Sequence, residues 1–266
     1  WDTMDMDFMN LNQSAHGDRE FGHICARMRK PRKVVSGYWK DERPQQQIAI
    51  WARVAAAWAD AHDMRILRFG DQMNNVAVTD GDKVEAEVRL GYHIDYYPVS
   101  SLIDYYMKVT DKEADELVEE YKKLYTIKID ESGEEIYWKK VHNAAKQEIA
   151  IRRVLQDEGA KGFTTNFDDL GEVDINDPNF IGFEGYGFGA EGDWKSAALY
   201  RTVWFMTQGM PNGCSFLEDY TLNFDGEKSS ILQSHMLEIC PLIAADKPRL
   251  EVHFLGIGIR KGFTAR

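Results

Sequence analysis

The stretch "MRILRFGD", residues 64–71, predicts the centre of the fold. It is a short apolar run that ends at a glycine, as expected for a buried strand. The segment before it, "PQQQIAIWARVAAAWADAHD" (44–63), predicts a helix, because its large apolar and alanine residues recur at three- and four-residue spacing: Ile48, Trp51, Ala55 and Trp58. A helix followed by a buried strand is the first sign of an α/β protein.

The same alternation continues along the chain. Further strands are expected at 33–39, 92–98 and 162–167, and further helices near 81–90, 99–108, 111–124, 137–159 and 194–209. This order predicts a Rossmann-like α/β domain, a parallel sheet with helices on both faces. After residue 213 the segments "CSFLEDYTLNF" and "RLEVHFLGIGI" are β-branched and aromatic, so a β-rich C-terminal domain is expected to begin there. We therefore predict domains at 1–62, 63–213 and 214–266.

Composition restricts the function classes. The net charge of -12 opposes nucleic-acid binding, which depends on clustered lysine and arginine. The basic cluster "RMRKPRK" (27–33) is short, and a solvated turn explains it better than a phosphate-binding patch. No apolar stretch approaches the roughly 20 residues that a membrane helix needs. We expect neither nucleic acid nor a membrane as a partner.

Cysteine usage indicates the cellular compartment. The chain has three widely spaced cysteines, Cys25, Cys214 and Cys240, and no CxxC pair. This pattern favours neither a disulfide framework nor a cysteine-built zinc site. The first residues also lack the basic leader and apolar run of a signal peptide. A reducing, cytoplasmic setting is expected.

Three segments carry side chains that could act together: Glu191 before a helix, Glu218 in a strand and His235 in a loop or short helix start. Two carboxylates and an imidazole suit Mn²⁺, Mg²⁺, Co²⁺ or Zn²⁺. Each residue also has an ordinary structural explanation. A glutamate after a glycine is commonly a solvated turn, a strand glutamate commonly faces water, and a single histidine is commonly a surface or core residue. Spacing alone favours these explanations over a metal site.

Long motifs around these residues resemble those of the L-arabinose isomerases. Three surround the candidate site: "GYGFGAEGDWKSAAL" (185–199), "GCSFLEDYTLNF" (213–224) and "SHMLEICPLIAADKP" (234–248). The resemblance also covers residues 1–29, 68–92 and 162–167, in order. It therefore extends over nearly the whole chain.

The resemblance implies a metal-dependent aldose–ketose isomerase that interconverts L-arabinose and L-ribulose, and often D-galactose and D-tagatose. It implies a divalent ion, typically Mn²⁺ with Co²⁺ or Mg²⁺ possible, held by Glu191, Glu218 and His235. The two glutamates are also the expected catalytic acid and base. The sugar pocket is expected to include Met73, Phe167 and His16, the last reaching a neighbouring subunit's site in oligomeric members. Met73 and Phe167 could instead be core residues, and His16 a loop residue.

The resemblance is to a short or truncated form that lacks most of the family's N-terminal and C-terminal regions. A fourth family ligand, a C-terminal histidine, has no counterpart, and His253 is the nearest replacement within this chain. Two alternatives stay open: a non-catalytic or weakly sugar-binding relic of such an enzyme, and a different isomerase such as one for L-fucose. A homo-oligomer is expected in either case, with the apolar face of the 48–59 helix as a pairing surface.

Overall fold

The computed structural model describes residues 4–129, 131–166, 169, 185–211, 213–235, 240–255 and 262–265. The chain forms two compact units, residues 1–52 and 53–266. The first unit holds α1 (Met6–Leu11), α2 (Ser14–Arg27) and the start of α3 (Glu42–Ala61), which ends in the second unit. Among the described residues, no helix is both long and apolar enough to cross a membrane.

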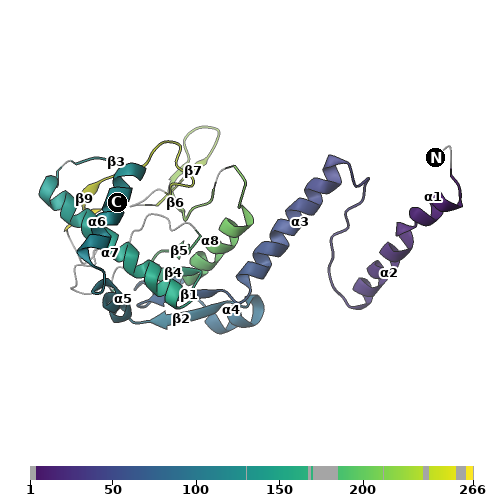
Figure 1. Cartoon of the computed structure of the whole chain (residues 1–266), viewed down its shortest axis with the longest axis horizontal. Helices are drawn as coiled ribbons and strands as arrows, with labels where there is room; N and C mark the ends of the chain where they lie inside the picture. Colours follow the sequence, from purple (N-terminus) through teal and green to yellow (C-terminus); the bar gives the residue numbers. More distant parts are fainter. Residues whose placement is uncertain are drawn as a thin grey trace. The chain divides into compact units, whose positions relative to one another are not determined.

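The second unit contains the other elements (Figure 1). Its further helices are α4 (Lys83–Leu90), α5 (Val99–Tyr106), α6 (Asp111–Leu124), α7 (Glu134–Asp157), α8 (Trp194–Met206) and the short 3-10 helix η1 (Ala77–Thr79). Its strands are β1 (Arg65–Phe69), β2 (His93–Tyr97), β3 (Thr126–Ile127), β4 (Gly162–Thr165), β5 (Gly187–Gly189), β6 (Glu218–Asn223), β7 (Ser230–Ser234), β8 (Arg249–Leu250), β9 (Val252–Leu255) and β10 (Gly262–Ala265).

The centre of this unit is a parallel sheet with the strand order β2-β1-β4-β5. The chain moves from β1 to β2 on one side and then returns to β4 on the other, so the strand order reverses between β1 and β4. In open sheets of this kind, ligands bind beyond the carboxyl ends of the strands at such a reversal. The sheet therefore indicates where a site should lie before any side chain is considered.

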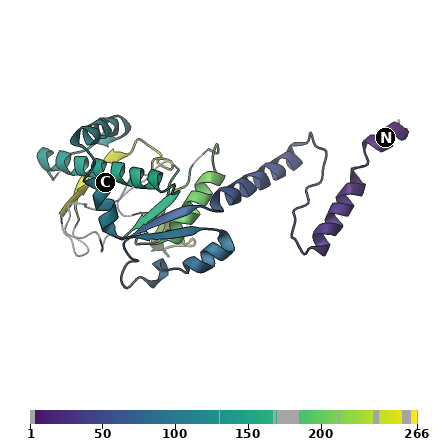
Figure 2. The same ribbon diagram turned by 60° about the horizontal axis from the view of Figure 1, so that its bottom comes forward.

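Helices cover both faces of the sheet, as the sequence predicts (Figure 2). Alternate residues of β1 point to opposite faces, and the two faces bury different sets of side chains. One face packs on residues from α5 and α7: Leu102, Ala150, Ile151, Val154 and Leu155 against Leu67, Phe69 and Phe163. The other packs on residues from α3, α4 and α8: Ala61, Ala86, Trp194, Ala197 and Ala198 against Ile66 and Ile94.

The C-terminal segments are β-rich, as expected, but they form small pairs. β6 and β7 make an antiparallel hairpin, β9 pairs with β10 in the same way, and β8 runs parallel to β3. Leu250 and Val252 are buried against α6 and α7, and the Tyr137 hydroxyl donates to the Leu250 carbonyl at 2.6 Å. The segment around β8 and β9 is thereby attached to the helical layer.

Most predicted elements are confirmed, and one is wrong. The predicted helix over 111–124 has the observed bounds of α6, where Thr110 and Glu113 form a capping box. The predicted strand at 33–39 is not formed, since residues 30–37 have no regular structure and Val34 and Trp39 are exposed. β propensity without a neighbouring strand leaves backbone groups unpaired, so local sequence alone does not make a strand there.

Candidate functional site

Glu191 lies in a tight turn between β5 and α8. Its backbone is left-handed, with φ of 61°, and Gly192 follows with φ of 82°. Non-glycine residues rarely adopt this conformation, and such residues are often found at functional sites. The turn carries the carboxylate just beyond the carboxyl end of β5, at the edge where the sheet topology predicts a site.

The start of α8 fixes this turn. The Asp193 carboxylate accepts hydrogen bonds from the Lys195 amide at 3.0 Å and from the Ser196 amide at 3.3 Å, which satisfies two orphan donors of the first helical turn. Trp194 is buried in the core under the helix. Asp193 therefore caps α8, and Trp194 anchors the first turn of the helix in the core.

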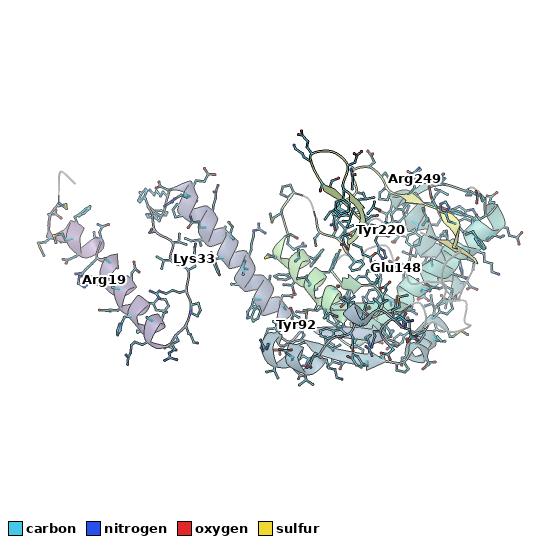
Figure 3. All side chains as sticks on the ribbon, turned by 180° about the vertical axis from the view of Figure 1, so that it is seen from behind. Arg19, Lys33, Tyr92, Glu148, Tyr220 and Arg249 are labelled. Carbon is cyan, nitrogen blue, oxygen red and sulfur yellow. The ribbon has the colours of Figure 1, made fainter. Side chains whose placement is uncertain are left out.

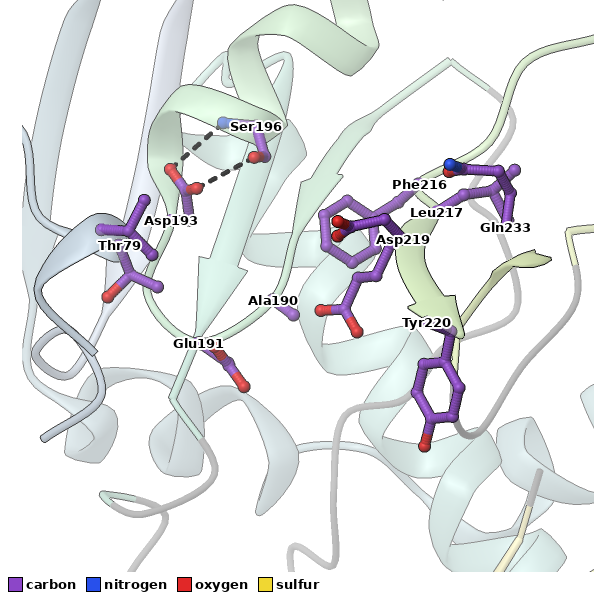
Figure 4. A pocket seen from close by; sticks show the side chains of 12 residues that line it. Thr79, Ala190, Glu191, Asp193, Ser196, Phe216, Leu217, Asp219, Tyr220 and Gln233 are labelled. Carbon is purple, nitrogen blue, oxygen red and sulfur yellow. Dashed lines mark hydrogen bonds between the residues drawn. The ribbon is translucent and has the colours of Figure 1, made fainter. Parts of the chain in front are cut away.

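Glu218 comes to the same place from the other side. It is the first residue of β6 and pairs with Ser234 at the end of β7. Glu191 and Glu218 both line a cavity of about 610 Å³. Figure 4 labels Glu191 in this cavity, together with Leu217 and Asp219, the two neighbours of Glu218 in the sequence. The other lining residues are Val78, Thr79, Ala190, Asp193, Ser196, Phe216, Leu217, Asp219, Tyr220 and Gln233. The fold therefore brings together two carboxylates that are 27 positions apart in the sequence.

His235 follows β7 and lies in a loop. Its ring packs edge-on against the ring of Phe216, with centroids 5.1 Å apart. Phe216 lines the cavity and also packs edge-on against Phe188 of β5, at 5.7 Å. This row of rings connects the sheet, the cavity wall and the histidine loop, so His235 packs against a residue that lines the cavity.

The donor types suit a divalent ion, because two carboxylates and a neutral imidazole provide hard oxygen and borderline nitrogen ligands. Within the described part of the chain, no group of three or more His, Cys, Asp or Glu side chains is gathered so that it could hold a metal ion. The chemistry of these three residues nevertheless fits a divalent ion.

His253 is the residue that the sequence suggests as a replacement for the fourth metal ligand, but it lies outside the candidate site. Its Nε2 contacts the Glu251 carboxylate at 2.5 Å, and Lys128 Nζ approaches the same carboxylate at 3.0 Å. The hydrogen bond from His253 holds the pKa of Glu251 at about 2, assisted by Lys128 and opposed by burial. His253 is not among the described residues that line the cavity. In the structure the partner of His253 is therefore Glu251, whereas the sequence suggested a metal ion.

The three predicted sugar contacts have different outcomes. The Met73 amide donates to the Glu191 carbonyl at 2.9 Å, so this residue is next to the site through its backbone, and its side chain is half-buried. His16 lies on α2 in the first unit and is exposed. Phe167 lies outside the described residues. All three remain predictions as sugar contacts.

Several lining residues were missed by sequence reasoning. Asp219 and Tyr220 directly follow Glu218, so the motif "LEDYT" contained them without showing that they face the same cavity. Thr79 comes from η1, more than a hundred positions before Glu191, and no local pattern marks it. Residues of this kind are recognised only when the strand order is known.

The fold and the cavity define a class: α/β proteins with a ligand site beyond the carboxyl ends of a parallel sheet, here with an acidic lining. Sequence comparison is more specific. Residues 1–63 match the L-arabinose isomerase N-terminal domain, 65–209 the central domain and 213–266 the C-terminal domain. The chain belongs to the L-arabinose isomerase family.

Individual relatives agree with this assignment. The chain is 67% identical to the L-arabinose isomerase of Bacteroides thetaiotaomicron, over 100% of its own length and 54% of the relative's. It is 67% identical to that of Phocaeicola vulgatus over the same shares, and 49% identical to that of Thermotoga neapolitana over 97% and 52%. The chain therefore spans about half the length of the curated relatives that it matches.

Proposed function

We propose that this chain carries the metal-binding and acid–base residues of an aldose–ketose isomerase acting on L-arabinose and L-ribulose, with D-galactose and D-tagatose as further substrates. One observation carries the proposal: Glu191 and Glu218 line one cavity at the carboxyl edge of the sheet. Family membership supplies the reaction class. We propose the domain division at 62/63 and 213/214 on the same basis.

The reaction moves a carbonyl group between C1 and C2 of the sugar. A proton leaves C2 while O1 gains one, which gives the enediol; the enediol then loses the proton of its O2 hydroxyl while C1 gains a proton. Two carboxylates facing one substrate can divide this work, one exchanging the carbon-bound proton and the other the hydroxyl proton. Glu191 and Glu218 are assigned this pair of roles.

Glu191, Glu218 and His235 are the proposed ligands of a divalent ion, with Mn²⁺ preferred and Co²⁺ or Mg²⁺ as substitutes. When bound, such an ion stabilises negative charge that develops on the sugar oxygens. The chain's own residues orient the substrate. Thr79, Ser196 and Gln233 line the cavity with groups that can hydrogen-bond to sugar hydroxyls.

A homo-oligomer is also proposed. α3 exposes Ile48, Ile50, Trp51 and Trp58, each about half exposed or more, on one continuous helix. Large apolar side chains gathered on an exposed helix indicate an interaction surface. Gel filtration with light scattering should give a mass above the 30.6 kDa of one chain, and a monomer at micromolar concentration would contradict this part of the proposal.

A second candidate function is a sugar-binding protein without turnover. The observation in its favour is that the described residues gather no group of three metal-ligating side chains. The two functions predict different results. If the chain binds sugar without isomerising it, added L-arabinose raises the melting temperature of the chain but no ketose forms.

The test measures ketose formation from L-arabinose by the purified chain after chelation, with and without Mn²⁺. Glu218→Gln should lower kcat by about 10²- to 10⁴-fold, the usual contribution of a general acid or base. Glu227→Gln is the matched control, because Glu227 is exposed in the turn of the same hairpin. Turnover that is independent of added metal, or equal in the two variants, would contradict the proposal.

A further inference from the structure

The turn that carries Glu191 is attached to the loop that follows β1. The Met73 amide donates to the Glu191 carbonyl at 2.9 Å, and the Gly192 amide donates to the Thr165 carbonyl at 3.0 Å. Gly192 packs directly on this loop, since a Cβ atom there would lie 2.6 Å from the Cα of Gln72. The backbone of Glu191 therefore depends on where the loop of residues 70–73 is held.

Two side chains that follow β4 in the sequence hold that loop. Asn166 is completely buried, and its Nδ2 donates to the Gln72 carbonyl at 3.1 Å and to the Asp169 carboxylate at 3.3 Å. The same Asp169 oxygen accepts from the Asp71 amide at 2.6 Å. It also lies against Gly70, where a Cβ atom would come within 2.7 Å of it and where φ is +84°. Two side chains thus satisfy backbone groups that have no partner strand.

Arg68 also holds this loop, by contacting the side chains of two loop residues. This residue is buried on β1, with its guanidinium stacked on the Tyr96 ring at 3.6 Å from the centroid. Its Nη1 donates to Gln72 Oε1 at 3.1 Å, and its Nη2 lies 3.0 Å from the Asp71 carboxylate. The stacked, buried guanidinium has little rotational freedom, so the loop is fixed from two directions.

We propose that Asn166 and Asp169 are positioning residues for Glu191. They hold residues 70–73 in the conformation in which the Met73 amide supports the left-handed turn, and the turn keeps the Glu191 carboxylate in the cavity. Neither residue is among the described residues that line the cavity. The inference rests on the proposed function, because it concerns how the same site is kept in its working geometry.

The test compares Asp169→Ala, Asp169→Asn and Thr110→Ala in the full chain. Asp169→Ala removes the acceptor of the Asp71 amide, whereas Asp169→Asn keeps one oxygen for it. Thr110→Ala is the control, because it removes a side-chain hydrogen bond to a backbone amide at the start of α6, a helix that does not line the cavity.

Asp169→Ala should weaken Mn²⁺ binding by about 10- to 100-fold, the usual effect of losing a residue that orients a metal ligand. It should also lower kcat for L-arabinose more than it changes KM, and the Met73 and Gly192 amides should exchange with deuterium faster. Asp169→Asn should recover most of these losses. Thr110→Ala should leave all three measurements at the wild-type level even if its melting temperature falls as far.

A purely structural role predicts a different result, namely a lower melting temperature with unchanged Mn²⁺ affinity, kcat and amide exchange well below that temperature. That result would overturn the inference. If Asp169→Ala does not fold, Asn166→Ser replaces it, since it removes the donor to Gln72 and should give the same changes.

Failure of the proposed function has its own signature. A wild-type chain that neither binds Mn²⁺ nor forms ketose would refute that function, and amide exchange alone would then decide the positioning role. Faster exchange at Met73 and Gly192 in Asp169→Ala, but not in Thr110→Ala, would support it. Equal exchange in the two variants would refute it.

Discussion

The two carboxylates of the candidate site lie on parts of the structure that are packed very differently. Glu191 follows a parallel sheet that is covered by helices on both faces, and Phe163 in that sheet is 1% exposed. Glu218 begins a two-stranded hairpin on which Leu222, Phe224, Ile231 and Leu232 are each at least half exposed. In Figure 3 the label Tyr220 marks the hairpin and the label Glu148 marks the helical layer.

The candidate site therefore combines two halves. The rigid half is the parallel sheet with Glu191, and the weakly packed, adjustable half is the β6–β7 hairpin with Glu218. An isolated hairpin is at best marginally stable in water, so the β6–β7 pair depends on what it packs against. Just before β6, Phe216 packs edge-on against Phe188 of the sheet. We infer that Glu191 is fixed by the fold, whereas Glu218 and His235 are the more adjustable members of the site.

The largest expected effect is on the rigid half. Phe163→Ala should lower the free energy of unfolding by about 3–5 kcal/mol, because it removes a fully buried ring from the sheet core. Phe224→Ala, on the hairpin and 75% exposed, should change it by less than about 0.5 kcal/mol. Urea unfolding of the two variants measures both. Equal losses would show that the hairpin is as firmly packed as the sheet.

Removing the ring contact between the two halves should separate stability from function. Phe216→Leu keeps apolar volume but loses the edge-on ring pairs with Phe188 and His235, which are worth about 0.5–1.5 kcal/mol each. Mn²⁺ affinity and kcat should fall, while the core around Phe163 stays protected in hydrogen exchange. Unchanged activity would mean that the hairpin is positioned by other contacts.

The cap of α8 should have a smaller effect on stability but a specific effect on the site. Asp193→Ala should cost about 1 kcal/mol, the usual value for an N-cap side chain, and lower activity by loosening the turn at Glu191. Asp82→Ala is the matched control, because Asp82 caps α4 with the same two-amide geometry. A similar fall in melting temperature with activity lost only in Asp193→Ala is expected. Equal activity in both variants would show that the cap does not position Glu191.

The smallest effect on the candidate site is expected from the C-terminal segment that is attached to the helical layer. The pKa of Glu251 is lowered to about 2 by its hydrogen bond from His253, against an ordinary value of 4.5. A depressed pKa contributes stability that is fully present above pH 4.5 and is lost as the pH falls toward 2. Glu251→Gln should therefore flatten the pH dependence of stability between pH 4.5 and 2. An unchanged slope would indicate that other carboxylates cause it.

The sequence predicted the elements of the rigid half well. The strand at 65–69 and the helix at 111–124 were predictable because each has a clear apolar pattern and a boundary signal, Gly70 after the strand and the Thr110 capping box before the helix. The strand at 33–39 was wrongly predicted, because strand formation depends on a partner that local sequence does not reveal.

The candidate site was predicted through family resemblance rather than through spacing. Nothing local to Glu191 or Glu218 indicates that they share a cavity, since that follows from the strand order. The hydrogen bonds of Asn166 and Asp169 to the loop of residues 70–73 were missed for a similar reason. They join side chains to a loop that lies more than 90 positions earlier in the chain.

The most direct test of the account is a double-mutant cycle for Mn²⁺ binding with Glu191→Gln, Glu218→Gln and the double variant. Two ligands of one ion are coupled, so the double variant should lose far less binding free energy than the sum of the two single losses. Isothermal titration with Mn²⁺ at fixed pH measures this. Losses that simply add, or a single variant that binds as tightly as the wild type, would contradict the claim that the rigid and the adjustable halves form one site.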